Sequence, residues 1–308
     1  MTKVSLVLGT GGARGYAHIG VIEELEARGY EIISIAGSSM GALVGGLYAA
    51  GGMDRYRAWV ETLGWIDVVR LLDLNFRNTL FNGDKVFARI KELIGDPDIE
   101  DLPIAYTAVA ADLTNNKEVW FQRGSLLQAM RASIAIPGVV APVVQGSRVL
   151  VDGGVLNPLP IVATVAAHAD MIIAVDVNAS RESVAMHLEP DELTHENAQP
   201  AKRIGRVALL LSSMEVMQGA LTRYKIAGYS PDLVIRVPKE AGGFHEFHRA
   251  KALIESGRKM ARRQLDLFEG LPAVASDANL MAEKLPTEPQ EDASTDQDST
   301  DQELTDQG

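Results

Sequence analysis

The chain has 308 residues, of which 46% are hydrophobic and 23% charged, enough for one large globular domain or two ordinary ones with a sizeable buried core. It contains no cysteine, which excludes disulfides, thiolate metal sites and cysteine catalysis. Ten acids and one base in residues 276–308 carry −9 of the net charge of −12, so residues 1–275 carry −3 and give no sign of nucleic-acid binding.

No segment has the pattern of a targeting or membrane-spanning sequence. The first residues, Met1–Leu8, hold a short apolar run, without a cationic region followed by a hydrophobic stretch of signal-peptide length. No window offers about eighteen uninterrupted apolar residues. The sequence therefore predicts a cytoplasmic protein, for which peripheral contact with a membrane surface is left open.

The beginning of the chain alternates strand and helix. A buried strand is predicted at 4–8, a glycine-rich loop at 9–15, a helix at 16–27 with apolar residues at helical spacing, and a second strand at 31–36. The run of small residues at 42–50, which follows this strand, is predicted to be a helix. This order predicts an α/β fold of three layers, in which helices cover both faces of a mainly parallel sheet.

Residues 53–100 are predicted to be helical, and their apolar side chains form either a cap over a site or, as we favour, ordinary core helices. These side chains are Trp59, Leu63, Trp65, Ile66, Val69, Leu71, Leu72, Leu74 and Phe76. Further strands are predicted at 104–111, 118–121, 148–151, 171–177 and 233–237, and further helices at 125–133, 160–168, 202–227 and 246–268. Residues 180–199 are predicted to be a polar loop, and the polar tail 276–308 is predicted to be disordered.

The second strand runs into Gly37-Ser38-Ser39-Met40-Gly41, a G-x-S-x-G pattern centred on Ser39. A sharp turn from strand to helix requires small flanking residues, which Gly37 and Gly41 supply. The serine at the centre is left at the start of a helix, where backbone N–H groups favour developing negative charge. Ser39 is therefore a candidate nucleophile, and Ser38, one place off the centre, is the weaker one.

The loop Gly9–Gly15 admits two interpretations. A dinucleotide-binding fingerprint would need glycine at position 14, which is Arg14, and an acid about twenty residues further on, which is missing. The alternative is an oxyanion hole, because consecutive glycines leave backbone N–H groups free to stabilise a transition state by about 3 kcal/mol per donor. The loop and the elbow follow neighbouring strands and so open at the same edge of a parallel sheet.

No histidine occupies the place after a strand where a triad histidine belongs; the six are His18, His168, His187, His195, His245 and His248. We expect structural or surface roles for all of them. Asp152 is better placed as the base, because it ends a strand and is followed by Gly153 and Gly154. Asp176 lies within a strand and is expected to be structural or orienting, and Asp112 is held in reserve.

In combination these motifs resemble those of the patatin-like phospholipase family. Residues 10–15 resemble its G-G-G-x-K/R-G oxyanion loop, with Thr10 in place of the first glycine. Residues 37–41 resemble its nucleophile elbow, and residues 152–154 its D-G-G/A motif. The three motifs occur in the family's order, the resemblance spans about residues 4–180, and the short bacterial members related to neuropathy target esterase are the most similar group.

The resemblance implies a patatin-like acyl hydrolase domain over residues 1–275, needing no metal or cofactor. It implies a lipid ester or phospholipid as substrate and a Ser39–Asp152 dyad that releases fatty acid. An oxyanion hole of Gly11, Gly12 and Ala13 is implied, and the supporting residues are Arg14, Gly15, Gly37, Gly41, Gly153 and Gly154. An aspartate with a pKa of about 3.9 is a weak base toward serine, so a desolvated site must compensate.

Three points stay open in the sequence. Arg14 is either solvated at the surface, bound to an anion such as a lipid phosphate, or a brace for the glycine loop. The protein is a hydrolase or, alternatively, a regulatory or adaptor protein on the same fold that uses its acidic tail for interaction. A nucleotide-binding α/β protein is the third interpretation.

Overall fold

The computed structural model describes residues 1–71, 83–185 and 205–270. Residues Met1–Leu271 form one compact unit. The tail predicted to be disordered lies outside the described residues, and so do Leu72, Leu74 and Phe76 of the predicted apolar helical region. Among the described helices, none combines the length and the apolar character that crossing a membrane requires.

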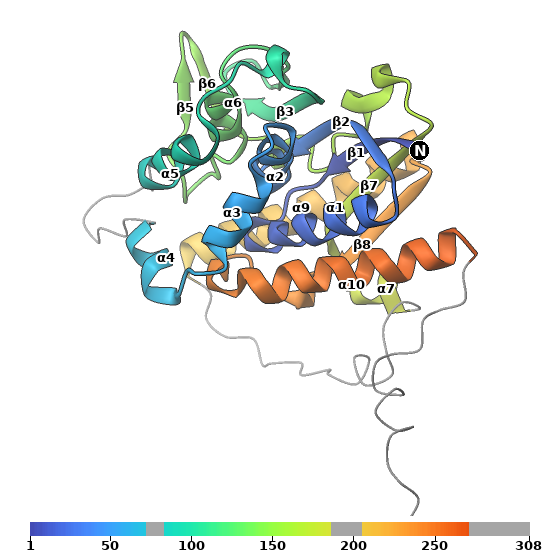
Figure 1. Cartoon of the computed structure of the whole chain (residues 1–308). Coiled ribbons are helices and arrows are strands. Elements are labelled where there is room, and N and C mark those ends of the chain that lie inside the picture. The colour runs from blue at the N-terminus through green and yellow to red at the C-terminus, as the bar shows by residue number, and fades with distance from the viewer. Residues whose placement is uncertain (72–82, 186–204, 271–308) are drawn as a thin grey trace, which may run out of the picture. The chain divides into compact units, whose positions relative to one another are not determined.

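The unit is built on a mixed sheet of eight strands in the order β5-β6-β3-β2-β1-β7-β8, with β4 paired to β3 (Figure 1). The strands are β1 (Lys3–Leu8), β2 (Glu31–Ser38), β3 (Ala105–Asp112), β4 (Lys117–Phe121), β5 (Val143–Gln145), β6 (Arg148–Asp152), β7 (Met171–Ala179) and β8 (Leu233–Pro238). Neighbours within β3-β2-β1-β7-β8 are parallel, whereas β4 and β6 run antiparallel to β3. The predicted α/β class with a mainly parallel sheet is therefore confirmed.

Helices connect and cover the strands. The α-helices are α1 (Ala17–Ala27), α2 (Met40–Ala49), α3 (Met53–Val60), α4 (Trp65–Leu71), α5 (Asp84–Ile94), α6 (Leu126–Ser133), α7 (Arg181–Val184), α9 (Arg206–Tyr229) and α10 (Ala250–Phe268). Short 3₁₀ segments are η1 (Gly12–Tyr16), η2 (Ile99–Asp101), η3 (Gly153–Val155), η4 (Ile161–Ala167), η6 (Lys239–Ala241) and η7 (Phe247–Arg249).

The two faces of the sheet bury separate apolar clusters. Successive side chains of a strand point to opposite faces. Leu6 and Leu8 of β1 therefore join the large cluster that α1, α2 and α10 cover, whereas Val7 joins Ile161 of η4 in a smaller cluster on the other face. Ile226 of α9 packs against this smaller cluster. The result is a helix–sheet–helix arrangement of three layers, as predicted.

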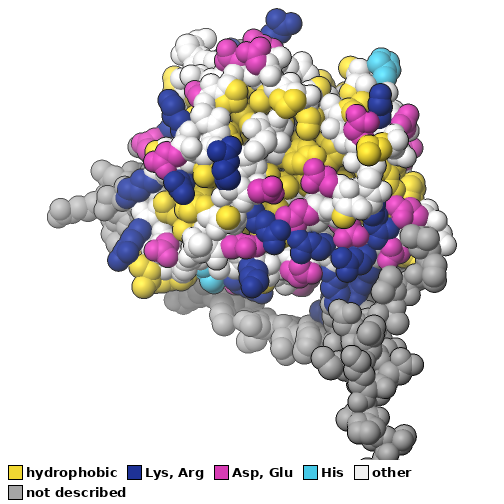
Figure 2. All heavy atoms as spheres, in the orientation of Figure 1, with side chains coloured by type: hydrophobic (Ala, Val, Ile, Leu, Met, Phe, Trp, Pro, Cys, Tyr) yellow, Lys and Arg dark blue, Asp and Glu magenta, His cyan; other side chains and the backbone are white. Residues whose placement is uncertain are grey.

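Helices α1 and α10 lie side by side on one face, at a separation that only glycine permits (Figure 1). A Cβ atom on Gly20 would lie 2.0 Å from the Ile254 carbonyl oxygen, and one on Gly257 would lie 2.0 Å from the Ala17 carbonyl oxygen. Along this face, positive and negative side chains intermingle (Figure 2). Arg28 is one example, because it pairs with carboxylates of both α1 and α10.

Two predicted helices differ from the structure, and strand β5 and the short helix α7 (Arg181–Val184) lie where the sequence predicts loops. The helix predicted over 160–168 is the 3₁₀ segment η4, and the helix predicted from Glu246 begins only at Ala250, after η7. Strand β5 was not predicted, because Pro142 immediately before it indicates a loop and three residues are too few for an alternating pattern. The predicted start of the long helix at Lys202 lies outside the described residues.

Candidate active site

Ser39 lies on a strained turn between β2 and α2. Its φ of 57° belongs to the left-handed region, which is a costly conformation for a residue other than glycine. The flanking glycines make the turn possible: a Cβ on Gly37 would lie 2.4 Å from the Ala42 nitrogen, and one on Gly41 would lie 2.1 Å from the Leu8 carbonyl oxygen. Because both positions are glycine, the backbone can pack this closely, and the turn has the geometry of the nucleophile elbow that its sequence pattern predicts.

Ser133, at the end of α6, holds the backbone of the elbow. The Ser39 N–H donates to Ser133 Oγ over 2.9 Å, and Ser133 Oγ in turn donates to the Val109 carbonyl oxygen over 2.6 Å. This buried hydroxyl therefore ties the elbow to strand β3. No sequence motif marks Ser133, because its role depends on the packing of α6 against the sheet.

Asp152 reaches the elbow through the register of β3. Ser38 pairs with Val109, and Asp152 pairs with Ala110, the next residue along β3. A Cβ on Gly153 would lie 2.1 Å from the Val109 carbonyl oxygen and 2.5 Å from Ser38 Oγ. Only glycine therefore lets the end of β6 approach the end of β2 so closely.

The Asp152 carboxyl is 1% exposed and is only partly satisfied. Its Oδ1 accepts the Gly154 N–H over 2.7 Å. Its Oδ2 and the Ser39 hydroxyl oxygen are both buried and lack a hydrogen-bond partner among the described residues. Unpaired buried polar atoms are rare in folded proteins and are common where a reacting group must remain available.

Burial gives this carboxyl an unusual affinity for protons. Loss of hydration raises the pKa of Asp152 from 3.8 to about 7, while the nearby Ser39 hydroxyl and the Gly154 N–H act in the opposite direction. A carboxyl with a pKa near 7 is a far stronger base than an ordinary aspartate, and it is still ionised in a large fraction of molecules at neutral pH.

The glycine loop between β1 and α1 faces the elbow. Gly15 permits the contact, because a Cβ there would lie 2.3 Å from the Met40 Cβ. Gly12 has a φ of 55°, a backbone conformation that glycine adopts more readily than other residues. The N–H groups of Gly11 and Gly12 donate no hydrogen bond within the described parts of the chain. The Ala13 N–H is predicted to be an oxyanion donor, but it is already engaged in this structure. It donates to the Phe244 carbonyl oxygen over 2.8 Å.

Arg14 is buried rather than solvated, with 6% of its surface exposed. Its Nε donates to Asn178 Oδ1 over 3.0 Å, and one terminal nitrogen donates to the Gly242 carbonyl oxygen over 3.3 Å. The other terminal nitrogen forms an ion pair with Glu215. Each guanidinium nitrogen is thus engaged with protein, which is the geometry of a brace for the loop.

None of the histidines that the structure describes forms a hydrogen bond with Ser39, although His245 lines the same cavity as Ser39. His18 is buried, its Nε2 lies 2.8 Å from the Gly9 carbonyl oxygen, and burial lowers its pKa to about 4. Asp112 holds a turn by accepting bonds from Thr114 and Asn115, and these bonds lower its pKa. His187 and His195 lie outside the described residues.

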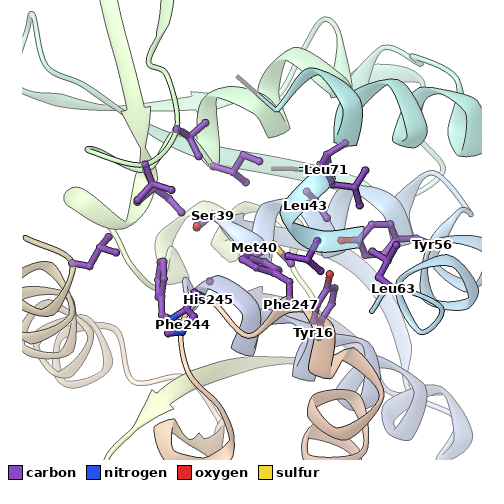
Figure 3. Close-up of a pocket in the computed structure, with 18 of the residues that line it drawn as sticks. Tyr16, Ser39, Met40, Leu43, Tyr56, Leu63, Leu71, Phe244, His245 and Phe247 are labelled. Carbon is purple, nitrogen blue, oxygen red and sulfur yellow. The ribbon is translucent and has the colours of Figure 1, made fainter. Parts of the chain in front are cut away.

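An apolar cavity of about 170 Å³ opens in front of Ser39 (Figure 3). In the close-up, the Ser39 oxygen points into the cavity, while Tyr56 and Leu63 lie toward its far end. Other lining side chains include Leu43, Val68, Leu71, Val140, Phe244 and Phe247. The sequence pattern of residues 53–100 favours core helices over a cap. Both roles occur: Leu63 packs against the large apolar cluster and also lines the cavity with Leu71, whereas Trp65 and Ile66 are exposed.

The chemistry that this arrangement suits is acyl transfer to a hydroxyl nucleophile, because a serine on a strained turn, a buried carboxyl with an unpartnered oxygen, unpaired N–H groups and an apolar cavity meet in one place. No group of three or more histidine, aspartate or glutamate side chains suited to a metal ion occurs within residues 1–71, 83–185 and 205–270.

Residues 6–165 match the family described as Patatin-like phospholipase. The chain belongs to the patatin-like phospholipase family. This patatin-like protein is 37% identical to an uncharacterized NTE family protein of Mycobacterium tuberculosis, over 87% of this chain and 92% of the relative. It is 35% identical to a lysophospholipase of Debaryomyces hansenii, over 60% of this chain but only 12% of that much longer relative.

Another relative is patatin-like phospholipase domain-containing protein 6 of Mus musculus, which is 34% identical over 58% of this chain and 14% of its own length. Among solved structures, VipD of Legionella pneumophila matches with a TM-score of 0.50 and 15% identity, over 87% of this chain and 67% of that one. At this identity, the match to VipD bears on the fold alone, and it agrees with the patatin-like architecture.

Proposed function

We propose that this patatin-like protein is a serine acyl hydrolase that releases fatty acid from lipid esters, of the phospholipase A or lysophospholipase type. Ser39 is the nucleophile and Asp152 the general base. The observation that carries the proposal is the pair of buried, unpartnered oxygens, Ser39 Oγ and Asp152 Oδ2, beside an apolar cavity. An apolar cavity suits an acyl chain, and a buried unpaired carboxylate suits proton transfer.

The reaction follows from the atoms present. Ser39 Oγ attacks the ester carbonyl carbon while Asp152 Oδ2 takes the hydroxyl proton. The oxyanion that forms is stabilised by the N–H groups of Gly11 and Gly12, together with the N–H of Met40 at the start of α2. Asp152 then gives its proton to the leaving alcohol, and the acyl group remains bonded to Ser39.

Deacylation repeats the sequence with water. The Asp152 carboxylate takes a proton from a water molecule, which attacks the acyl carbon; the bond to Ser39 Oγ breaks, the serine regains its proton and the fatty acid leaves. An ordinary aspartate is a weak base, but the pKa of Asp152 is raised to about 7. Proton transfer is most effective when the pKa of the base lies near the working pH, so this shift supports Asp152 as the base.

The test is labelling and turnover in parallel. Wild type, Ser39→Ala and Asp152→Asn are treated with a fluorophosphonate and assayed on p-nitrophenyl esters and lysophospholipids. We expect Ser39→Ala to lose labelling and turnover, and Asp152→Asn to lose turnover while remaining folded. Labelling that persists in Ser39→Ala, or near-wild-type turnover by Asp152→Asn, would contradict the dyad. A folded wild type that neither labels nor turns over any ester would favour the regulatory or adaptor alternative.

A further inference from the structure

A second cavity, of about 630 Å³, lies beside the glycine loop and takes no part in the chemistry proposed for Ser39. Its walls come from α9, from the end of β7 and from β8 with the residue after it. Besides Arg14, three cations line it: Arg223 on α9, Arg236 on β8 and Lys239 after β8. None of these three forms an ion pair with another residue in the described parts of the chain.

The charges around this cavity do not balance. Arg14 and Glu215 also line it, but they pair with each other. The remaining acid is Asp176 of β7. Burial raises its pKa, whereas the Asn178 N–H and the positive charges of Arg236, Arg14 and Arg223 act in the opposite direction. One carboxylate facing three unpaired cations leaves about two positive charges in excess, which matches a phosphate monoester near neutral pH.

The hydrogen-bond donors, the volume and the apolar surface of the cavity further restrict the class of ligand that fits it. Guanidinium groups bind phosphate oxygens through two parallel N–H donors, and the hydroxyl of Ser212 on α9 adds a neutral donor. The volume falls within the range of about 300–1,000 Å³ typical of small-molecule sites and is far larger than an inorganic anion needs. Val216 and Ile226 of α9 supply apolar surface for an organic group.

We propose that this cavity binds a phosphate monoester, with its phosphate between Arg223, Arg236 and Lys239 and its organic part along α9. This site goes beyond the proposed hydrolase function and does not depend on it. The shared chemistry is a singly esterified phosphate, carried either by a soluble metabolite or by a lipid head group.

Asn178 connects this cavity to the glycine loop, so a ligand bound in the cavity should affect the loop. The side chain of Asn178 lines the cavity, donates to the Thr10 carbonyl oxygen over 2.6 Å and accepts from Arg14 Nε. Its backbone N–H donates to Asp176 Oδ1 over 2.9 Å. A ligand that contacts this wall therefore touches the bonds that hold residues 10–14. Bound ligand should slow amide hydrogen exchange in this loop.

The binding test uses calorimetric titration with glycerol 3-phosphate and inorganic phosphate, and co-sedimentation with phosphatidylcholine vesicles with and without phosphatidate. Ionic strength is held constant with chloride, because screening alone changes charge interactions. The variant is Arg223→Gln with Arg236→Gln. The control is Arg55→Gln, an exposed arginine of α3 that does not line the cavity.

We expect saturable binding by wild type and by Arg55→Gln, and at least about tenfold weaker binding by the double variant, since each substitution removes charged hydrogen-bond donors to the phosphate. Binding of glycerol 3-phosphate identifies a soluble ligand, and binding of phosphatidate vesicles alone identifies a lipid head group. No saturable binding of any probe, or equal affinity in the double variant, overturns the proposal. If the double variant does not fold, Lys239→Gln at an exposed position replaces it, with the same expected direction.

Discussion

The buried carboxyl of Asp152 should cost the protein stability at alkaline pH, and this cost can be measured. An acid whose pKa is raised in the folded state binds its proton more tightly there than in the unfolded chain. Its contribution to stability is therefore fully present below the unfolded pKa of 3.8 and is lost as pH rises through the folded pKa of about 7.

The size of the effect follows from the shift. One pKa unit corresponds to about 1.4 kcal/mol, so moving from 3.8 to about 7 costs on the order of 4 kcal/mol once the carboxylate is fully ionised. Part of this loss has already occurred by about pH 5, and on the order of 2–3 kcal/mol of it should appear between about pH 5 and about pH 8.

Asp152→Asn removes the charge while keeping the shape. The asparagine Oδ1 can still accept the Gly154 N–H, and its Nδ2 can donate to Ser39 Oγ, which otherwise lacks a partner among the described residues. We therefore expect the stability advantage of Asp152→Asn over wild type to grow by on the order of 2–3 kcal/mol between about pH 5 and about pH 8, although the variant should hydrolyse no ester.

The assay is urea denaturation of wild type and Asp152→Asn at the two pH values, compared as a double difference so that other titrating groups cancel. Asp112→Asn is the matched control, because Asp112 also ends a strand and is 1% exposed but has a lowered pKa. Its difference from wild type should be the same at both pH values. A pH-independent difference for Asp152→Asn would refute the proposed protonation of this carboxyl.

Four further outcomes are expected. The kcat/KM of wild type on a neutral ester should fall about tenfold per pH unit below about 7, because the Asp152 base is then protonated; a flat profile would remove it as the base. Leu63→Trp should lower kcat/KM on long-chain esters at least about tenfold and spare the acetyl ester, since Leu63 lies toward the far end of the cavity; equal losses would mean that acyl chains bind elsewhere. Arg14→Ala should lower kcat on a neutral ester and on a lysophospholipid by the same factor, at least about tenfold, because the loop loses its brace; a loss confined to the lysophospholipid would indicate contact with phosphate. Ser133→Ala should lower kcat about tenfold without changing KM, and unchanged kcat would show that the elbow keeps its geometry without this bond.

The sequence by itself predicts those features of the protein that depend on residues close together in the chain. A strand, a turn and a helix are encoded within a few residues, so Gly37, Ser39 and Gly41 reveal the elbow, and the order of strands and helices reveals the α/β class. Glycine is informative here because the Cβ of any other residue would clash with backbone at positions such as Gly41 and Gly153. The family resemblance rests on the same short motifs.

Long-range packing decides the rest, because it joins residues that no local pattern connects. The register of β3 brings Asp152 beside the elbow from 113 positions away in the chain, and burial by the surrounding elements then raises its pKa. The surroundings of Arg14 are likewise tertiary, because Asn178, Glu215 and the Gly242 carbonyl come from distant segments and bind its guanidinium in a buried position. The apolar cavity and the cationic cavity exist only where side chains from distant segments converge, so their presence and charge follow from the folded structure alone.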